Sequence, residues 1–205
     1  MNPYELYFVT DDQQDIETLC SVVKQAIAGG VTMVQIREKH GDVRAFIERA
    51  RAVKSVMRGS GVPLIINDRV DVALAVDACG VHLGQSDMLV ADARRLLGDN
   101  KLLGLSVESE EQLLEAQSFA VDYLGVSAIF ATPTKTNTVK HWGIEGLTKA
   151  VELSKLPLVA IGGINDSNIK SVVDTGVDGI ALVSAISAAS DPTQASKDLL
   201  IKMRS

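Results

Sequence analysis

Eight short apolar runs alternate along this chain with longer segments in which apolar residues recur every three or four positions. Each run is bounded by polar, charged or glycine residues, a pattern that predicts short buried strands. The runs are Leu6–Val9, Met33–Ile36, Pro63–Ile66, Val81–Leu83, Leu102–Leu105, Tyr123–Val126, Leu158–Ile161 and Ile180–Val183. The segments Asp15–Ala28 and Val43–Met57 have the i, i+3, i+4 spacing of amphipathic helices.

Helices are predicted after the later strands as well. They are expected near Val70–Ala75, Val90–Leu97, Ser109 to about Ala120, Ile144–Ser154, Asn168–Thr175 and Thr193–Met203. Strands that alternate with helices pair in parallel through right-handed crossovers. Eight such units in 205 residues average about 26 residues each, which is a plausible βα period. We therefore expect an α/β fold, a single-domain (β/α)8 TIM barrel over residues 1–205.

An open, doubly wound sheet is the main alternative architecture. Such a sheet usually carries a Gly-x-Gly-x-x-Gly turn directly after its first strand. In this chain the first strand is followed by Thr10-Asp11-Asp12 instead, which favours the closed barrel.

Composition narrows the classes of function. Lys and Arg number 20 against 26 Asp and Glu, a net charge of −6, and there is no basic run, so a nucleic-acid partner is not expected. No apolar stretch is long enough to span a bilayer, and the N-terminus lacks the regions of a signal peptide. Cys20 and Cys79 lie far apart, as in a reduced cytoplasmic protein. A homo-oligomer is compatible with this composition.

Two carboxylates follow neighbouring predicted strands. Asp68 comes after the third strand, and Asp87 lies just past the fourth. At one rim of a barrel they would suit a Mg²⁺ ion that takes its other ligands from water and substrate phosphate. Each has a structural alternative, because Asp68 could cap a helix beginning at Arg69-Val70 and Asp87 could cap the next helix.

Cations and glycines also follow predicted strands. Arg37 and Lys39 leave the second strand, and Lys135 lies in a long polar loop after the sixth. Such cations suit the binding of phosphate groups. Gly162-Gly163 after the seventh strand and Ser184 after the eighth have the arrangement of a barrel phosphate site. The two glycines would equally suit a tight turn with positive φ.

The histidines offer no catalytic arrangement. His82 falls inside an apolar run and is expected to be a hydrogen-bonded core residue. The sequence has no P-loop, nucleophile elbow or His-Glu-x-x-His motif, so neither covalent catalysis nor zinc-dependent hydrolysis is indicated.

Eight segments in barrel order carry a resemblance to a known family. They are Leu6–Asp11, Gly30–Lys39, Pro63–Arg69, Gly80–Asp87, Gly104–Val107, Thr132–Lys135, Ala160–Ile164 and Val183–Ile186. Together they resemble thiamine-phosphate synthase (thiamine-phosphate pyrophosphorylase). The resemblance implies a TIM-barrel transferase whose partners are small molecules. Such an enzyme joins hydroxymethylpyrimidine diphosphate to a thiazole phosphate, plain or carboxylated, and forms thiamine phosphate and pyrophosphate.

The resemblance also implies a role for each matching residue. The pyrimidine diphosphate would be held by Gln35, Arg37, Lys39, Asn67, Ser106 and Lys135, and the thiazole phosphate by Thr132, Thr134, Gly163, Val183 and Ser184. Ile36, Glu38 and Pro133 would line the substrate site beside them, and Asp68 and Asp87 would ligate Mg²⁺. Of these, Arg37, Lys39, Ser106 and Lys135 are the expected catalytic groups.

The chain departs from the family pattern in two places. The family commonly has Gly-Pro after the sixth strand and another proline in the loop, where this chain has Ser127-Ala128-Ile129-Phe130-Ala131. The stretch Val139–Trp142 is also bulkier than usual. These departures bear on loop closure and on the thiazole more than on the reaction.

The residues suit the reaction that the resemblance implies. Diphosphate would leave a carbon attached to an electron-rich aminopyrimidine, whose ring can stabilise the resulting cation. The protein then needs no nucleophile, only groups that position both partners and neutralise the departing charge. We therefore expect a largely dissociative displacement. A thiazole tautomerase of the same fold and a non-catalytic barrel that binds thiamine phosphates stay open as alternatives.

Overall fold

The computed structural model describes residues 2–131 and 141–205. Its strands are β1 (Leu6–Val9), β2 (Met33–Ile36), β3 (Leu64–Asn67), β4 (Gly80–Leu83), β5 (Leu102–Val107), β6 (Tyr123–Ser127), β7 (Leu158–Ile161) and β8 (Gly179–Leu182). Its helices are α1 (Ile16–Ala28), α2 (Val43–Val56), α3 (Val70–Val76), α4 (Val90–Leu97), α5 (Glu110–Ala116), α6 (Gly143–Leu153), α7 (Ile169–Val173), α8 (Ser184–Ser187) and α9 (Pro192–Arg204).

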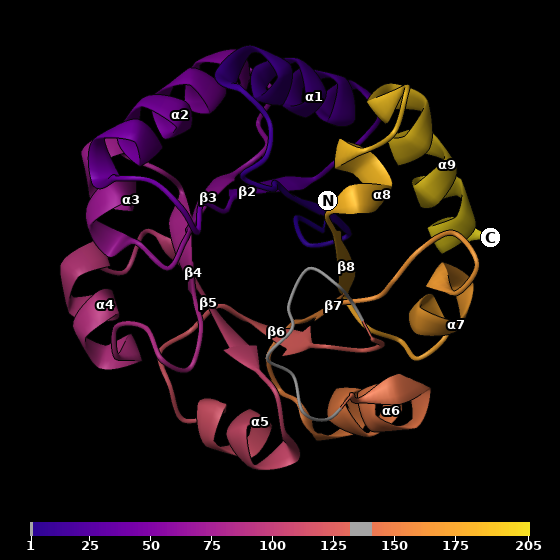
Figure 1. Cartoon of the computed structure of the whole chain (residues 1–205). Helices are drawn as coiled ribbons and strands as arrows, with labels where there is room; N and C mark the ends of the chain where they lie inside the picture. The colour runs from indigo at the N-terminus through magenta and orange to yellow at the C-terminus, as the bar shows by residue number, and fades with distance from the viewer. Residues whose placement is uncertain (1, 132–140) are drawn as a thin grey trace.

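The strands form one closed parallel barrel in chain order, with β8 paired to β1. In the closing register, Tyr7 of β1 lies opposite Met33 of β2 on one side and Ala181 of β8 on the other. Figure 1 shows the helices as an outer ring around the strands. The TIM-barrel prediction is confirmed, and the doubly wound alternative is wrong, because an open sheet would leave β1 and β8 unpaired.

Alternate residues of each strand enter two separate cores. In β1, Leu6 and Phe8 pack outward against the helices, whereas Tyr7 and Val9 point into the barrel. The barrel interior is filled by Tyr7, Val9, Met33, Ile65, Tyr123, Val159 and Ala181. Two tyrosines in so small a set make this interior more polar than a core of aliphatic side chains alone.

Capping residues begin several of the helices. Side chains accept a hydrogen bond from the third residue beyond them at Asp15, Asp42, Ser109 and Asp191. Each cap satisfies a backbone N–H that has no partner inside the helix. No helix among the described residues is both long and apolar enough to cross a bilayer.

Most element boundaries differ from the prediction by one or two residues, and two differences have a clear physical reason. Helix α5 ends at Ala116 and not near Ala120, because Gln117, Ser118 and Phe119 turn by bonding the carbonyl three residues back. Strand β8 ends at Leu182, and Val183 is instead the N-cap of α8, a four-residue helix that the apolar pattern did not predict.

Candidate active site

The carboxyl ends of the strands bring the predicted site residues to one rim of the barrel. Residues in or just after a strand are Gln35, Arg37 and Lys39 at β2, Asn67 and Asp68 at β3, Asp87 at β4, Ser106 at β5, Gly163 at β7, and Val183 and Ser184 at β8. In a closed parallel barrel all of these positions face the same end. The predicted residues Thr132, Pro133, Thr134 and Lys135 lie outside the described part of the chain.

The two carboxylates of the predicted metal site are neighbours. Burial, and then a hydrogen bond that the protonated Asp87 carboxyl donates to the Asp68 carboxylate, raise the pKa of Asp87. The Asp87 side chain also accepts a hydrogen bond of 2.7 Å from the backbone N–H of Gly84. Asp68 has a left-handed backbone with φ of 61°, and its amide donates to the His82 carbonyl at 2.8 Å. Left-handed backbone at a non-glycine residue is costly and is found most often at functional sites.

Neither carboxylate caps a helix. The N-cap of α3 is Arg69 and that of α4 is Leu89, and neither helix start has a side-chain cap. The capping alternative for Asp68 and Asp87 is therefore wrong. Two anions side by side repel unless a cation lies between or beside them, and Lys39 supplies one such cation next to Asp68.

Lys39 supplies positive charge beside the carboxylates, and Arg37 directly follows the same strand, β2. The Lys39 ammonium forms an ion pair with Asp68 while its side chain stays 43% exposed. Arg37 is half-buried, and its guanidinium has no hydrogen bond or ion pair with any residue that the structure describes. A guanidinium held at the rim without a partner is suited to an anionic ligand.

Two predicted substrate contacts lie elsewhere. Ile36 is fully buried in the core between the strands and the helices, so its side chain does not reach the rim. Glu38 forms an ion pair of 2.9 Å with Arg49 of α2, and both side chains are mostly buried. The structure thus places the Ile36 side chain in the core toward the helices and pairs the Glu38 side chain with α2.

A hydrogen-bonded chain crosses the barrel interior and connects two of the predicted residues. The Gln35 amide donates to the Tyr7 hydroxyl at 2.7 Å, and the Tyr7 and Tyr123 hydroxyls lie 2.9 Å apart. His82 Nδ1 lies 3.0 Å from the Tyr123 hydroxyl, and its Nε2 lies 2.9 Å from the Ser106 hydroxyl. Burial raises the pKa of both tyrosines, so both stay protonated and able to donate.

Sequence reasoning missed the two tyrosines of this chain. It expected His82 to be a hydrogen-bonded core residue, and both imidazole nitrogens do have partners, one of which is the predicted site residue Ser106. Tyr7 and Tyr123 looked like ordinary strand residues. The signal that could have found them is the alternation of side chains along a strand. Tyr7 is two residues from Val9, so both side chains lie on the inward face of β1.

Two buried polar side-chain atoms at the rim have no hydrogen-bond partner in the part of the chain that the structure describes. The Asn67 side chain is 7% exposed, and its Nδ2 has no acceptor among the described residues. Ser127, the last residue of β6, is 5% exposed, and its hydroxyl also has no hydrogen-bond partner among the described residues. Buried donors without acceptors are rare in native proteins and often mark a place that a ligand completes. Ser127 was noted in the sequence only as a departure from the family pattern.

The two glycines after β7 form the tight turn with positive φ that the sequence left open as the alternative to a phosphate site. Gly162 and Gly163 have φ of 101° and 69°, and a Cβ on Gly163 would lie 2.7 Å from the Ala131 carbonyl. The glycines are thus needed by the backbone whether or not a phosphate binds. Next to this turn, Val183 and Ser184 form the start of α8.

Comparisons with known proteins identify the family of this chain. The family described as thiamine monophosphate synthase matches residues 6–186. Thiamine-phosphate synthase of Vibrio campbellii is 69% identical over 204 residues, covering 100% of both chains, and that of Vibrio parahaemolyticus is 67% identical, covering 99% of this chain and 100% of its own. Thiamine phosphate pyrophosphorylase from Pyrococcus furiosus superposes with a TM-score of 0.89 at 40% identity, covering 99% of this chain and 96% of that one.

These matches extend over nearly the full length of the chain and of its relatives. They do not favour a tautomerase or a non-catalytic barrel, the alternatives that the sequence had left open. The chain belongs to the thiamine monophosphate synthase family and is a transferase with thiamine-phosphate synthase activity.

Proposed function

We propose that this enzyme joins a pyrimidine carrying a diphosphate to a thiazole phosphate at the rim described above. The products are thiamine phosphate and pyrophosphate. The observation that carries the proposal is the carboxylate pair Asp68 and Asp87, set beside Lys39 and near the unpaired Arg37. This is a set of groups for a diphosphate and its counter-ion, and an isomerase acting on a thiazole alone would not need it.

Asp68 and Asp87 fit a magnesium ion. They are hard oxygen ligands within hydrogen-bond reach of each other, and Mg²⁺ typically takes one or two carboxylates plus substrate phosphate. Burial and the neighbouring Asp68 carboxylate raise the pKa of Asp87, and a divalent cation bound between the two would favour its charged form. When bound, the ion would neutralise charge on the leaving diphosphate.

The chain's own residues would position the two substrates and neutralise the charge of the leaving diphosphate. Arg37 and Lys39 would contact phosphate oxygens, and the unpaired Nδ2 of Asn67 would donate to another. Gln35 and Ser106, held from behind by the buried hydrogen-bonded chain, would orient the pyrimidine. On the far side of the rim, Gly163, Val183 and Ser184 would hold the thiazole phosphate, together with the loop residues Thr132–Lys135.

The reaction would be a largely dissociative displacement. The bond between the methylene carbon and the diphosphate oxygen breaks, its electron pair leaves with the diphosphate, and the thiazole nitrogen then bonds to the carbon. No protein nucleophile takes part. Electron-withdrawing groups on the pyrimidine should therefore slow turnover sharply, and rates insensitive to such groups would count against this mechanism.

Cytoplasmic location is part of the proposal. Cys20 and Cys79 are both free thiols, and Cys79 is exposed. An exposed, unpaired thiol is best kept in a reducing compartment.

Pyrophosphate release tests the proposal directly. We expect release only when the pyrimidine diphosphate, the thiazole phosphate and Mg²⁺ are all present. Asp87→Ala should lose Mg²⁺-dependent turnover and keep the wild-type unfolding transition, because Asp87 is at the rim and caps no helix. Asp92→Asn, in an exposed pair with Arg95, is the matched acidic control and should keep full activity. An active Asp87→Ala enzyme would remove the metal site from the proposal.

A further inference from the structure

A second cavity lies at the opposite end of the barrel from the rim. It has a volume of about 630 Å³ and is walled by the C-terminal half of α2, the loop before β3 and the connection before β4. Its lining includes Leu64, the first residue of β3, whereas Asn67 at the rim is the last residue of that strand. The volume is in the range of about 300–1,000 Å³ typical of small-molecule sites.

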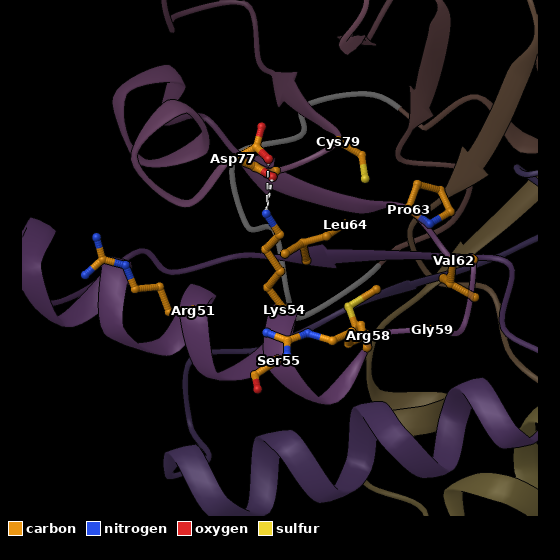
Figure 2. A pocket seen from close by; sticks show the side chains of 13 residues that line it. Arg51, Lys54, Ser55, Arg58, Gly59, Val62, Pro63, Leu64, Asp77 and Cys79 are labelled. Carbon is orange, nitrogen blue, oxygen red and sulfur yellow. Dashed lines mark hydrogen bonds and ion pairs between the residues drawn. The ribbon is translucent and has the colours of Figure 1, made fainter.

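The floor of this cavity is apolar. Met57, Leu64 and Ala78 line it and are almost fully buried, at 5%, 3% and 1% exposure. Val62 and Pro63 continue this surface half-buried, and the exposed thiol of Cys79 stands at its edge. Figure 2 shows Pro63, Leu64 and Cys79 on the strand side and the helix α2 residues on the other. Such a floor would cover the apolar body of a ligand.

The walls of the cavity are basic. Arg51, Lys54 and Arg58 line it, and Asp77 is the one acidic residue among the lining residues. Lys54 bonds the Val76 and Asp77 carbonyls at 2.9 and 2.7 Å, and Figure 2 shows its side chain crossing from α2 to Asp77. The two oxygens of the Asp77 carboxylate are taken by Lys54 at 3.3 Å and Lys101 at 2.8 Å. Each carboxylate oxygen of Asp77 thus has a lysine partner, although the side chain stays exposed.

Arg51 and Arg58 have no acidic partner among the described residues. Neither guanidinium has a hydrogen bond or an ion pair with any residue in the described ranges 2–131 and 141–205. Among the described residues, Arg49, Arg69, Arg94, Arg95 and Arg204 have acidic partners, whereas Arg37 at the rim and the exposed Arg44 have none either. What distinguishes Arg51 and Arg58 is that both line the same cavity. In a chain of net charge −6, two uncommitted guanidiniums on one cavity are a local excess of positive charge.

We propose that this cavity is a second binding site, separate from catalysis, for a small organic anion with an apolar body, such as an aromatic phosphate or carboxylate. The anionic group pairs with Arg51 and Arg58, and the apolar body lies over Met57, Leu64 and Ala78. The bound molecule covers Cys79.

Protection of Cys79 provides a test that is independent of enzyme activity. The probe is 1-naphthyl phosphate, and the measurement is the rate of alkylation of Cys79 by iodoacetamide, followed by peptide mass spectrometry. A probe at about ten times its Kd leaves about one-tenth of the sites empty, so alkylation of Cys79 should slow about tenfold. Cys20 is on α1, outside the cavity, and its rate is the internal reference.

Variants and matched compounds decide between the outcomes. The double variant Arg51→Ser/Arg58→Ser should lose the protection, and Arg44→Ser, an exposed arginine of the same helix outside the cavity, should keep it. Unchanged alkylation of wild-type Cys79, or protection that survives in the double variant, would overturn the proposal. Equal protection by inorganic phosphate would refute the apolar contact, and equal protection by neutral 1-naphthalenemethanol would refute the anionic one.

Discussion

At the scale of single residues, Asn67 presents a conflict between stability and function. Its side chain is 7% exposed and its Nδ2 has no acceptor among the described residues. A buried donor left unsatisfied costs about 1–3 kcal/mol of folding free energy. A residue that costs stability in the free protein is explained if its amide pairs with a ligand.

Asn67→Ala should separate these two effects. We expect the free energy of unfolding to stay the same or to rise by up to about 1 kcal/mol, since the unsatisfied donor is removed. We expect kcat/KM to fall by about tenfold or more, because a hydrogen bond to a charged group is worth about 1.5–3 kcal/mol. Urea unfolding and steady-state kinetics measure the two quantities on the same preparations.

Ser196→Ala is the control with the opposite expectation. Ser196 is fully buried in α9, and its hydroxyl donates to the Pro192 carbonyl at 2.8 Å. Its loss should lower stability by about 1 kcal/mol and leave kcat/KM unchanged. If Asn67→Ala instead behaves like Ser196→Ala, then Asn67 is a structural residue.

At this scale the sequence predicts which residues lie at the rim, but not their backbone conformation or their hydrogen-bond and ion-pair partners. That Asp68 and Asp87 follow adjacent strands is enough to predict that they meet. Whether they cap helices depends on where α3 and α4 begin, and helix starts are uncertain by one or two residues in a sequence. The left-handed backbone of Asp68 and its pairing with Lys39 depend on the folded loop and have no signature in the residue order.

At the scale of elements, the buried hydrogen-bonded chain ties together five strands. It runs through Gln35 of β2, Tyr7 of β1, Tyr123 of β6, His82 of β4 and Ser106 of β5. Glycine makes room for it, because a Cβ on Gly104 would lie 2.3 Å from Cζ of Tyr123 and 2.4 Å from Nδ1 of His82. The Tyr123 hydroxyl therefore joins the two halves of the chain, with Tyr7 and Gln35 on one side and His82 and Ser106 on the other.

Tyr123→Phe tests this arrangement. Removing the hydroxyl leaves His82 Nδ1 without this partner and breaks the connection to Tyr7, at a cost of about 1–3 kcal/mol in stability. Because Gln35 and Ser106 then lose their common support, kcat should fall more than the loss of stability alone would explain, at a temperature where the variant is fully folded. Thermal unfolding followed by circular dichroism defines that temperature.

Tyr4→Phe is the matched control for this variant. Tyr4 stacks on Tyr123 with ring centroids 5.1 Å apart, and its hydroxyl takes no part in the buried chain. Its removal should affect neither kcat nor KM. An equal loss of kcat in both variants would mean that the effect does not depend on the buried hydrogen-bonded chain.

The sequence specified most elements because their patterns are long enough to read. Strand positions agree within two residues, since each apolar run ends at a polar or glycine residue. The misses were short features: α8 is four residues long, too short to show helical periodicity, and α5 ends early through local turns at Gln117–Phe119. The inward chain of Tyr7, Tyr123 and His82 depends on strand stagger around the barrel, which a single sequence does not reveal.

At the scale of the whole molecule, closure of the barrel brings the two ends of the chain together. Strand β1 pairs with β8, and α9 packs against α1. Arg204, at the end of α9, forms an ion pair with Glu5, which lies just before β1. Its Nε donates to Oε1 of Glu5 at 2.7 Å and its Nη2 donates to Oε2 at 2.8 Å. This two-pronged ion pair links the last helix to the first strand.

Glu5→Gln should reveal what this closing contact contributes, and how it depends on pH. The hydrogen bond from Arg204 lowers the pKa of Glu5 below its ordinary 4.5, against an opposing effect of burial. The unfolded chain thus binds more protons than the fold between the two pKa values, so stability rises with pH through that window. The contribution is complete above about pH 5 and is lost as pH falls through the folded pKa.

We expect Glu5→Gln to be less stable than wild type by about 0.5–1 kcal/mol at pH 7, the value of a partly exposed ion pair. The difference should shrink as the pH is lowered from 5 toward 3, because wild type then loses the same charge by protonation. Urea unfolding across this range measures it, with Glu152→Gln, an exposed residue of α6, as the control that stays parallel to wild type. Parallel curves for Glu5→Gln as well would mean that strand pairing and helix packing close the barrel without help from this ion pair.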